Sequence, residues 1–314
     1  MTVKEVFDLR KQGKIEEAYE TIRPMYAVHK GKYTTLCMFW TASDILKKRL
    51  QEKRTEEAGK IFEALLRIVP NIEDRDGKVH QALLHDALRL KEALPTFNML
   101  AFLEQYGADR LTDADWQGCM TTPKAGTAER PHALPSTAQR LLTHCFHEIQ
   151  DNPDMDKALK VMPLLTEAAR RLPKDKHVLR YMAVVYKIMG ERDKAIAVYR
   201  KLLTRHHDSY LYAELAELTD EAGAKAALLC RAIDNQRQEK FRTGYRWELA
   251  QLLVDRDKRR AAYELQKCAA TRKALGFHLN RDMLAMLNQL SGVEPATDAE
   301  QSDFYKQMML KFPV

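Results

Sequence analysis

Residues 176–209 read KHVLRYMAVVYKIMGERDKAIAVYRKLLTRHHDS, and this stretch decides the fold. Its apolar residues recur at three- to four-residue intervals, which predicts amphipathic helices over 176–189 and 192–205. Gly190 falls between them, where a positive φ can end the first helix. The stretch therefore predicts a helical hairpin.

The same spacing continues along the chain, which is rich in Ala, Leu, Lys, Arg and Glu. No alternating β-branched run is long enough to predict a strand. The spacing predicts further helices at 2–12, 15–29, 33–53, 55–69, 77–92, 95–106, 137–150, 156–172, 209–221, 224–235, 241–255, 258–274 and 279–290. We therefore expect an all-α protein.

The hairpin is organised by a set of small and aromatic residues at fixed spacing, namely Met182, Ala183, Tyr186, Gly190, Ala195, Tyr199 and Leu202. This pattern resembles the tetratricopeptide repeat family, whose unit is a 34-residue helix–turn–helix. Weaker copies cover about residues 1–70 and 137–275. The resemblance implies a right-handed α-solenoid of antiparallel helix pairs.

The resemblance also implies a concave groove, lined by the first helix of each unit, that receives a peptide or protein segment. Carried over to this sequence, the groove positions are Arg140, His147, His177, Arg180, Lys187, Tyr210, Trp247 and Gln251. Arg180 and Lys187 could hold a carboxylate. Arg180 is the better donor of the two, because a guanidinium group can bind a carboxylate through two parallel hydrogen bonds. A neutral reading, in which these residues only solvate the inner face, stays open.

Prolines and glycines concentrate at 107–136 and interrupt the helical pattern. We expect an N-terminal helical layer at 1–106, an irregular joint at 107–136 and a repeat array at 137–290. The remaining residues, 291–314, would form a polar linker and a short capping helix from about Phe304. This layout also resembles a loose group of bacterial repeat proteins.

Lys and Arg concentrate between Arg237 and Arg281, a segment that contains twelve of them and only five Asp and Glu. The resulting excess of +7 equals the formal net charge of the whole chain. A basic face is predicted at Arg256, Lys258, Arg259, Arg260, Arg272 and Lys273. With aromatic residues interleaved, this face fits an acidic protein surface or a nucleic-acid backbone.

Catalytic and metal-binding motifs are missing from the sequence, including GxSxG, the P-loop and HExxH. His144 and His147 share a helical face but lack further ligands for zinc. An enzyme would need side chains to converge around Trp116, Cys119 and His132. We expect no catalytic residue, no cofactor and no metal.

The five cysteines are scattered without paired spacing, which argues against a disulfide framework and favours the cytoplasm. No stretch is apolar enough for a membrane span. The sequence thus predicts a cytoplasmic, non-enzymatic adaptor that binds a protein or peptide. An acidic partner is compatible with this prediction. The alternative is a nucleic-acid-associated protein that uses the basic face, and the oligomeric state stays open.

Overall fold

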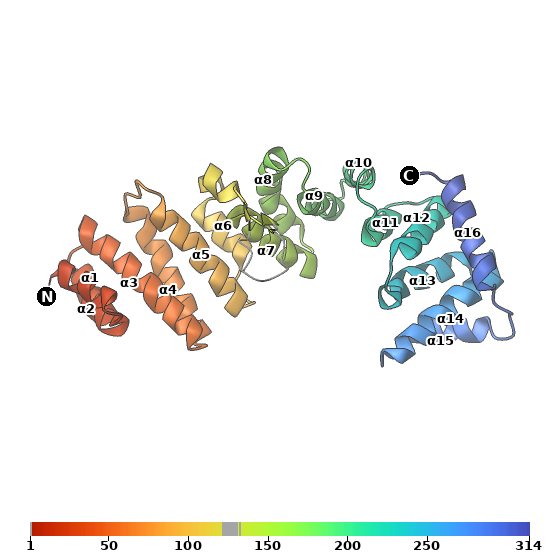
Figure 1. Cartoon of the computed structure of the whole chain (residues 1–314), viewed down its shortest axis with the longest axis horizontal. Helices are drawn as coiled ribbons and strands as arrows, with labels where there is room; N and C mark the ends of the chain where they lie inside the picture. The colour runs from red at the N-terminus through yellow and green to blue at the C-terminus, as the bar shows by residue number, and fades with distance from the viewer. Residues whose placement is uncertain (1, 121–130, 132) are drawn as a thin grey trace. The chain divides into compact units, whose positions relative to one another are not determined.

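A computed structural model describes residues 2–120, 131 and 133–314, and these residues form an all-α protein as expected (Figure 1). In chain order the helices are α1 (Val3–Lys11), α2 (Ile15–Val28), α3 (Lys32–Gln51), α4 (Thr55–Ile68), η1 (Val69–Asn71), α5 (Lys78–Ala93), α6 (Met99–Tyr106), η2 (Ala108–Arg110), η3 (Asp113–Trp116), α7 (Thr137–Asp151), α8 (Met155–Arg171), α9 (Lys176–Ile188), α10 (Arg192–Leu203), α11 (Ser209–Glu217), α12 (Ala222–Asn235), α13 (Glu239–Leu253), α14 (Lys258–Ala274), α15 (Arg281–Gln289) and α16 (Asp298–Lys311).

The chain divides into two compact units, Met1–Arg171 and Leu172–Val314. The segment boundaries expected near residues 106 and 136 both fall inside the first unit. The expected layer, joint and array therefore stay predictions, as does the handedness of a solenoid.

In the first unit, helices that follow one another in the chain pack side by side, most extensively α2, α3 and α4 (Figure 1). Phe39, Phe62 and Phe146 are fully buried in its core. The irregular segment adds a feature that the sequence did not predict, a short antiparallel pair between β1 (Cys119–Met120) and β2 (Ala133–Leu134). Each strand has two residues, too few to leave an alternating pattern.

The second unit contains the hairpins α9–α10, α11–α12 and α13–α14. Gly190 has the expected positive φ of 74°, and its N–H donates to the carbonyl of Lys187 to close the end of α9. Ala183, Ala195 and Tyr199 are fully buried between the paired helices. The hairpin predicted at 176–209 is therefore present.

The C-terminal helix differs from its prediction, because α16 begins at Asp298 rather than near Phe304. Thr297 and Glu300 form a capping box in which each side chain accepts the other residue's backbone N–H. Asp298 and Glu300, which the sequence analysis placed in the linker, thus lie in the first turn, where carboxylates favour a helix. The helix packs against α12.

Candidate binding surface and polar clusters

Three first helices of hairpins in the second unit, α9, α11 and α13, carry most of the predicted groove residues. Cations of α9 bind carboxylates at and on α11: Lys176 Nζ lies 3.1 Å from Asp208, and Arg180 Nη2 lies 2.5 Å from Glu214 Oε1. Lys187 pairs with Glu217 in the same way. We call these pairs the α9–α11 ladder.

Arg180 is the most enclosed cation of the ladder. Its Nε and Nη2 both donate to Glu214, and its guanidinium lies 5.0 Å from the centre of the Tyr210 ring. Burial would lower the pKa of Arg180, but the Glu214 carboxylate outweighs it and the pKa is raised. A partner's carboxylate would have to displace Glu214 to bind here.

Helix α13 extends this surface beyond α11. The side-chain amide of Gln236, just before α13, donates to the Ser209 hydroxyl of α11 at 3.1 Å. Trp247 is half-buried and Gln251 is exposed. Between them in the sequence, Glu248 is half-buried; burial and the nearby Glu217 charge raise its pKa, and the charges of Lys225 and Lys187 act against that increase. Within the described residues, Glu248 has no hydrogen bond or ion pair.

Three further groove candidates do not take part in the α9–α11 ladder. His177 is exposed at the start of α9, with its ring 6.4 Å from that of Tyr181. Arg140 and His147 belong to α7 in the first unit, where Arg140 binds Glu92 at 2.8 Å and His147 is exposed. The groove candidates of the second unit therefore lie on α9, α11 and α13, whereas Arg140 and His147 lie in the first unit.

The predicted basic face consists of two ends of the α13–α14 hairpin. At the start of α14, Arg259 binds Glu300 of α16 at 3.2 Å. Arg260 pairs with Asp257 and lies 4.6 Å from the centre of the Phe304 ring. Sequence reasoning assigned these cations no structural role, because it could not foresee that α16 returns to meet them. Arg256 and Lys258 are exposed beside them.

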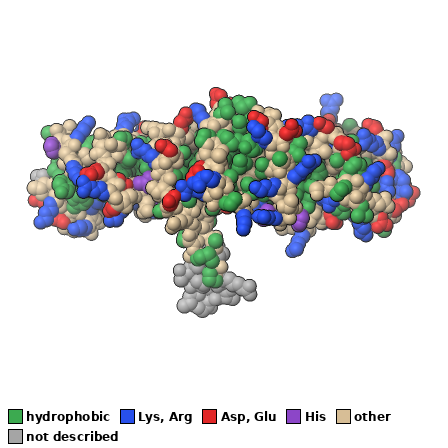
Figure 2. All heavy atoms as spheres, turned by 90° about the horizontal axis from the view of Figure 1, so that it is seen from above, with side chains coloured by type: hydrophobic (Ala, Val, Ile, Leu, Met, Phe, Trp, Pro, Cys, Tyr) green, Lys and Arg blue, Asp and Glu red, His purple; other side chains and the backbone are tan. Residues whose placement is uncertain are grey.

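At the other end, Arg272 donates to the carbonyl of His278 at 3.1 Å and Lys273 is exposed. Elsewhere on the visible surface, Lys and Arg are interspersed with Asp and Glu (Figure 2).

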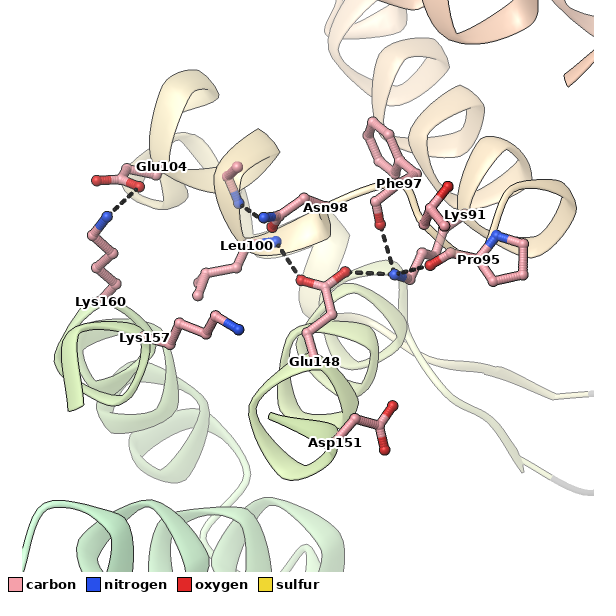
Figure 3. Close-up of a pocket in the computed structure, with 12 residues that line it drawn as sticks. Lys91, Pro95, Phe97, Asn98, Leu100, Glu104, Glu148, Asp151, Lys157 and Lys160 are labelled. Atoms are coloured by element: carbon pink, nitrogen blue, oxygen red, sulfur yellow. Dashed lines mark hydrogen bonds and ion pairs between the residues drawn. The ribbon is translucent and has the colours of Figure 1, made fainter. Parts of the chain in front are cut away.

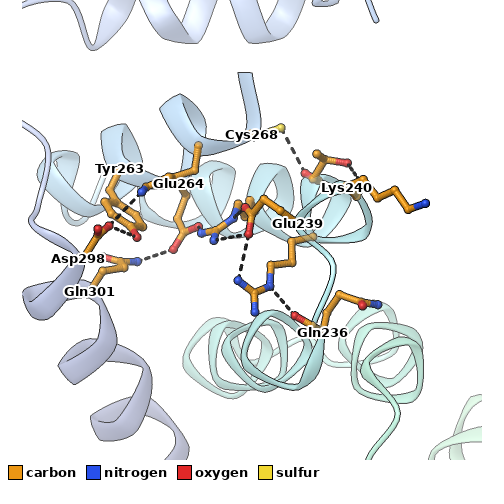
Figure 4. Close-up of polar contacts among 12 residues, drawn as sticks. Gln236, Glu239, Lys240, Tyr263, Glu264, Cys268, Asp298 and Gln301 are labelled. Atoms are coloured by element: carbon orange, nitrogen blue, oxygen red, sulfur yellow. Dashed lines mark hydrogen bonds and ion pairs between the residues drawn. The ribbon is translucent and has the colours of Figure 1, made fainter. Parts of the chain in front are cut away.

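A buried polar cluster connects α13, α14 and α16, and the sequence analysis missed it (Figure 4). Glu264 is fully buried; Arg246 Nη1 lies 2.7 Å from its Oε2, and Gln301 Nε2 lies 2.5 Å from its Oε1. Tyr305 donates to the same carboxylate, and Arg246 also binds Glu239 at 2.6 Å. The available signal was that Glu264 is the only carboxylate between Asp257 and Asp282 in the sequence.

Burial raises the pKa of Glu264, and the three donors act against that increase. Burial would lower the pKa of Arg246, yet the carboxylates around it raise it. Both Glu264 oxygens and the guanidinium nitrogens of Arg246 have partners, as a buried ion pair requires, whereas Gln301 Oε1 is buried without one among the described residues.

In the first unit, a pocket of about 390 Å³ lies beside the start of α6 (Figure 3). Lys91 Nζ donates to the Phe97 carbonyl and to Glu148, each at 2.6 Å. The Glu148 carboxylate accepts the N–H groups of Met99 and Leu100. Helix α6 begins at Met99 instead of residue 95 because the Asn98 side chain caps it by accepting the Ala101 N–H, while Lys91 donates to the Pro95 and Phe97 carbonyls of the turn before it.

A second buried cluster of the first unit is centred on His80, which lies on α5. Its Nε2 lies 2.7 Å from Asp115 Oδ2 and its Nδ1 lies 2.5 Å from the Tyr106 hydroxyl. Burial would raise the pKa of Asp115, but hydrogen bonds from His80 and Thr112 lower it. The cluster joins α5, α6 and η3.

The residues of the enzyme alternative do not form a described site. Trp116 is buried beneath the Arg171 guanidinium, 5.7 Å from the ring centre, and Cys119 is exposed. His132 lies outside the described residues. Within the described chain, no group of three or more His, Cys, Asp or Glu side chains is placed to hold a metal ion. Among the helices that the structure describes, none combines the length and apolar character needed to cross a bilayer.

The second unit is thus a set of helical hairpins whose first helices carry polar side chains. A family described as a domain of unknown function, DUF7017, matches residues 178–311, which lie within this unit. No curated protein matches the chain.

Several solved structures are similar over most of the chain. A tetratricopeptide repeat protein from Parabacteroides merdae ATCC 43184 is 11% identical with a TM-score of 0.36, covering 92% of this chain and 97% of that one. BtubC (BKLC) from P. vanneervenii is 10% identical with a TM-score of 0.27, covering 92% and 94%. The structure of Naa15/Naa10 bound to HypK-THB is 13% identical with a TM-score of 0.21, covering 99% and 53%.

Proposed function

We propose that this protein is a non-enzymatic, tetratricopeptide-like scaffold that binds a segment of a partner protein across α9, α11 and α13. The observation that carries the proposal is the Glu248 carboxylate, which is half-buried on α13 and has no hydrogen bond or ion pair among the described residues. A half-buried carboxylate without a partner costs folding free energy, because it loses hydration and gains no ion pair. A bound partner would supply the missing contact.

The chemistry of the surface favours a basic partner segment. Arg180 and Lys187, which the sequence suggested for an acidic partner, already bind Glu214 and Glu217. Glu248 instead offers an acceptor to Lys or Arg. Trp247 lies one position away and could contact the aliphatic part or the cation of such a side chain. An extended or helical segment could span the three helices with little ordering of the protein.

Peptide selection from a random library displayed on phage tests this proposal. We expect enriched peptides to contain Lys or Arg and to bind at least tenfold more weakly to Glu248→Gln and to Trp247→Ala. Glu191→Gln is the matched control, because Glu191 is a partly exposed carboxylate that precedes α10 and pairs with Lys194. Enrichment of acidic peptides, or equal losses in the control, would contradict the proposal.

We also propose a cytoplasmic location. All five cysteines are free thiols, and Cys37, Cys145, Cys230 and Cys268 are buried in the two cores. A reducing compartment keeps exposed thiols such as Cys119 in that form. Labelling of thiols in intact cells with a membrane-impermeant reagent should leave Cys119 unmodified.

A further inference from the structure

The two ends of the α13–α14 hairpin differ in how their cations are used. Helix α14 has 17 residues, so its ends lie about 25 Å apart. At its start, Arg259 and Arg260 bind Glu300 and Asp257. Its last turn lies beside the first turn of α13, since Cys268 Sγ contacts the Thr243 carbonyl at 3.3 Å (Figure 4). This second end contains a different arrangement of charge.

Four exposed cations lie at this second end, namely Arg237, Lys240, Lys273 and Arg281. None of the four has an ion pair with any residue that the structure describes. The carboxylate of Glu239 is occupied by Arg242 and Arg246. Asp234 and Asp282 are the exposed carboxylates nearest in sequence, so the four cations exceed them by two.

Two phenylalanines are exposed among these cations. Phe241 is 53% exposed and Phe277 is 59% exposed. Lys240 Nζ lies 4.7 Å from the centre of the Phe241 ring, and the Arg272 guanidinium lies 5.9 Å from that of Phe277. We name Arg237, Lys240, Phe241, Lys273, Phe277 and Arg281 the aromatic basic end.

We propose that the aromatic basic end binds single-stranded nucleic acid without sequence preference. Unpaired cations attract the phosphates, and exposed rings stack on bases, which is the combination that single-strand-binding surfaces use. A duplex hides the faces of its bases and could not use Phe241 and Phe277. This site is separate from Glu248 and Trp247, so it stands or falls independently of the proposed scaffold function.

Fluorescence anisotropy with a labelled oligo(dT) of about 20 nucleotides tests the proposal on the full chain. We expect binding at about 50 mM salt that weakens steeply towards about 200 mM. Lys240→Gln with Lys273→Gln should reduce affinity about tenfold and flatten the salt dependence, because two phosphate contacts are lost. Arg256→Gln with Lys258→Gln is the matched control, since it removes two exposed cations from the opposite end of the hairpin.

A second variant separates stacking from charge. Phe241→Leu with Phe277→Leu keeps apolar surface and total charge but removes both rings, and we expect a loss of about tenfold or more. Circular dichroism verifies that each variant is folded. Absence of binding at low salt, equal losses in the Arg256 and Lys258 control, or full affinity without the rings would overturn the proposal. Tighter binding of poly-glutamate than of oligo(dT) would also overturn it and would indicate an acidic protein partner.

Discussion

Two ionic clusters in the second unit use the same chemistry in different surroundings. In the buried cluster, the side chains of Arg246 and Glu264 are 6% and 0% exposed, and Tyr305 and Gln301 complete the hydrogen bonding. In the α9–α11 ladder, Lys187 and Glu217 are 43% and 45% exposed, and Arg180 and Glu214 are each 19% exposed. The first cluster connects three helices, whereas the second lies on a surface that water can reach.

The difference teaches that exposure, more than distance, determines what an ion pair does for the protein. A buried charge cannot be rehydrated when its partner is lost, so removal of one partner from the buried cluster strongly destabilises the fold. An exposed pair exchanges protein contacts for water at small cost, so a ligand can replace it. Loss of a ladder pair should therefore cost less stability than loss of the buried pair.

The largest expected effect is on Arg246. Arg246→Ala leaves the Glu264 carboxylate buried without its counter-charge and should lower the free energy of unfolding by about 3–5 kcal/mol. Urea denaturation followed by circular dichroism measures the change. Arg242→Ala is the control, because Arg242 also binds Glu239 but is 26% exposed, and it should cost less than about 1 kcal/mol. Equal losses in both variants would break the comparison.

A test in the first unit asks whether the same rule holds there. Asp115→Asn should cost about 1–3 kcal/mol at pH 7, because it weakens buried hydrogen bonds to His80 and Thr112. The folded pKa of Asp115 lies below its unfolded value, so its stabilisation is present above about pH 4 and is lost as the pH falls through the folded pKa. The variant should therefore lose less stability than the wild type between pH 7 and pH 3 in urea titrations. An unchanged acid slope would show that Asp115 does not contribute through its charge.

The ladder itself should matter less for stability than the buried cluster. Arg180→Ala with Lys187→Ala should cost about 1–2 kcal/mol in total, with most of it from Arg180, which is 19% exposed, binds Glu214 and contacts Tyr210. Differential scanning calorimetry in low and high salt checks this, since salt screens exposed pairs. A loss as large as that of Arg246→Ala would contradict the distinction between the clusters.

The smallest effect is expected at Glu248, with the opposite sign. The folded pKa of Glu248 is raised, so its ionised form is disfavoured and Glu248→Gln should slightly stabilise the protein at pH 7, by less than about 1 kcal/mol. The gain should disappear as the pH falls below the unfolded pKa of about 4, where the wild-type carboxyl is itself protonated. Thermal unfolding at pH 7 and pH 3.5 measures both, and a destabilised variant at pH 7 would refute this assignment. A stabilising substitution that abolishes binding is typical of functional positions.

The helices could be predicted closely from the sequence, because each depends on local periodicity. The predicted helix at 258–274 matches α14 at both ends, and the one at 176–189 exceeds α9 by a single residue. Predictions failed where a distant contact or a side-chain cap determines the boundary. Lys91 holds the turn before α6, and the Thr297 cap starts α16 earlier than its apolar residues indicate.

The candidate surface was predictable only in part, for a related reason. The helical repeat places Arg180 and Lys187 along α9, but their pairing with Glu214 and Glu217 depends on the register between two hairpins. Glu264 could be recognised only as an unusual residue, since its partners Arg246 and Gln301 lie 18 and 37 residues away. Spacing within one helix contains no information on either register.

Helix α16 has a consequence for how the second unit unfolds. In a simple repeat array each hairpin contacts only its neighbours, so hairpins can open from one end in succession. Here α16 packs on α12, Arg231 donates to the Met309 carbonyl 78 residues further along, and Gln301 binds Glu264 of α14. Opening of α12 or α14 must therefore break contacts with α16 as well. Amide protons of α12, α14 and α16 should exchange with solvent as one cooperative group, which makes this part of the array a single foldon rather than a row of separable hairpins.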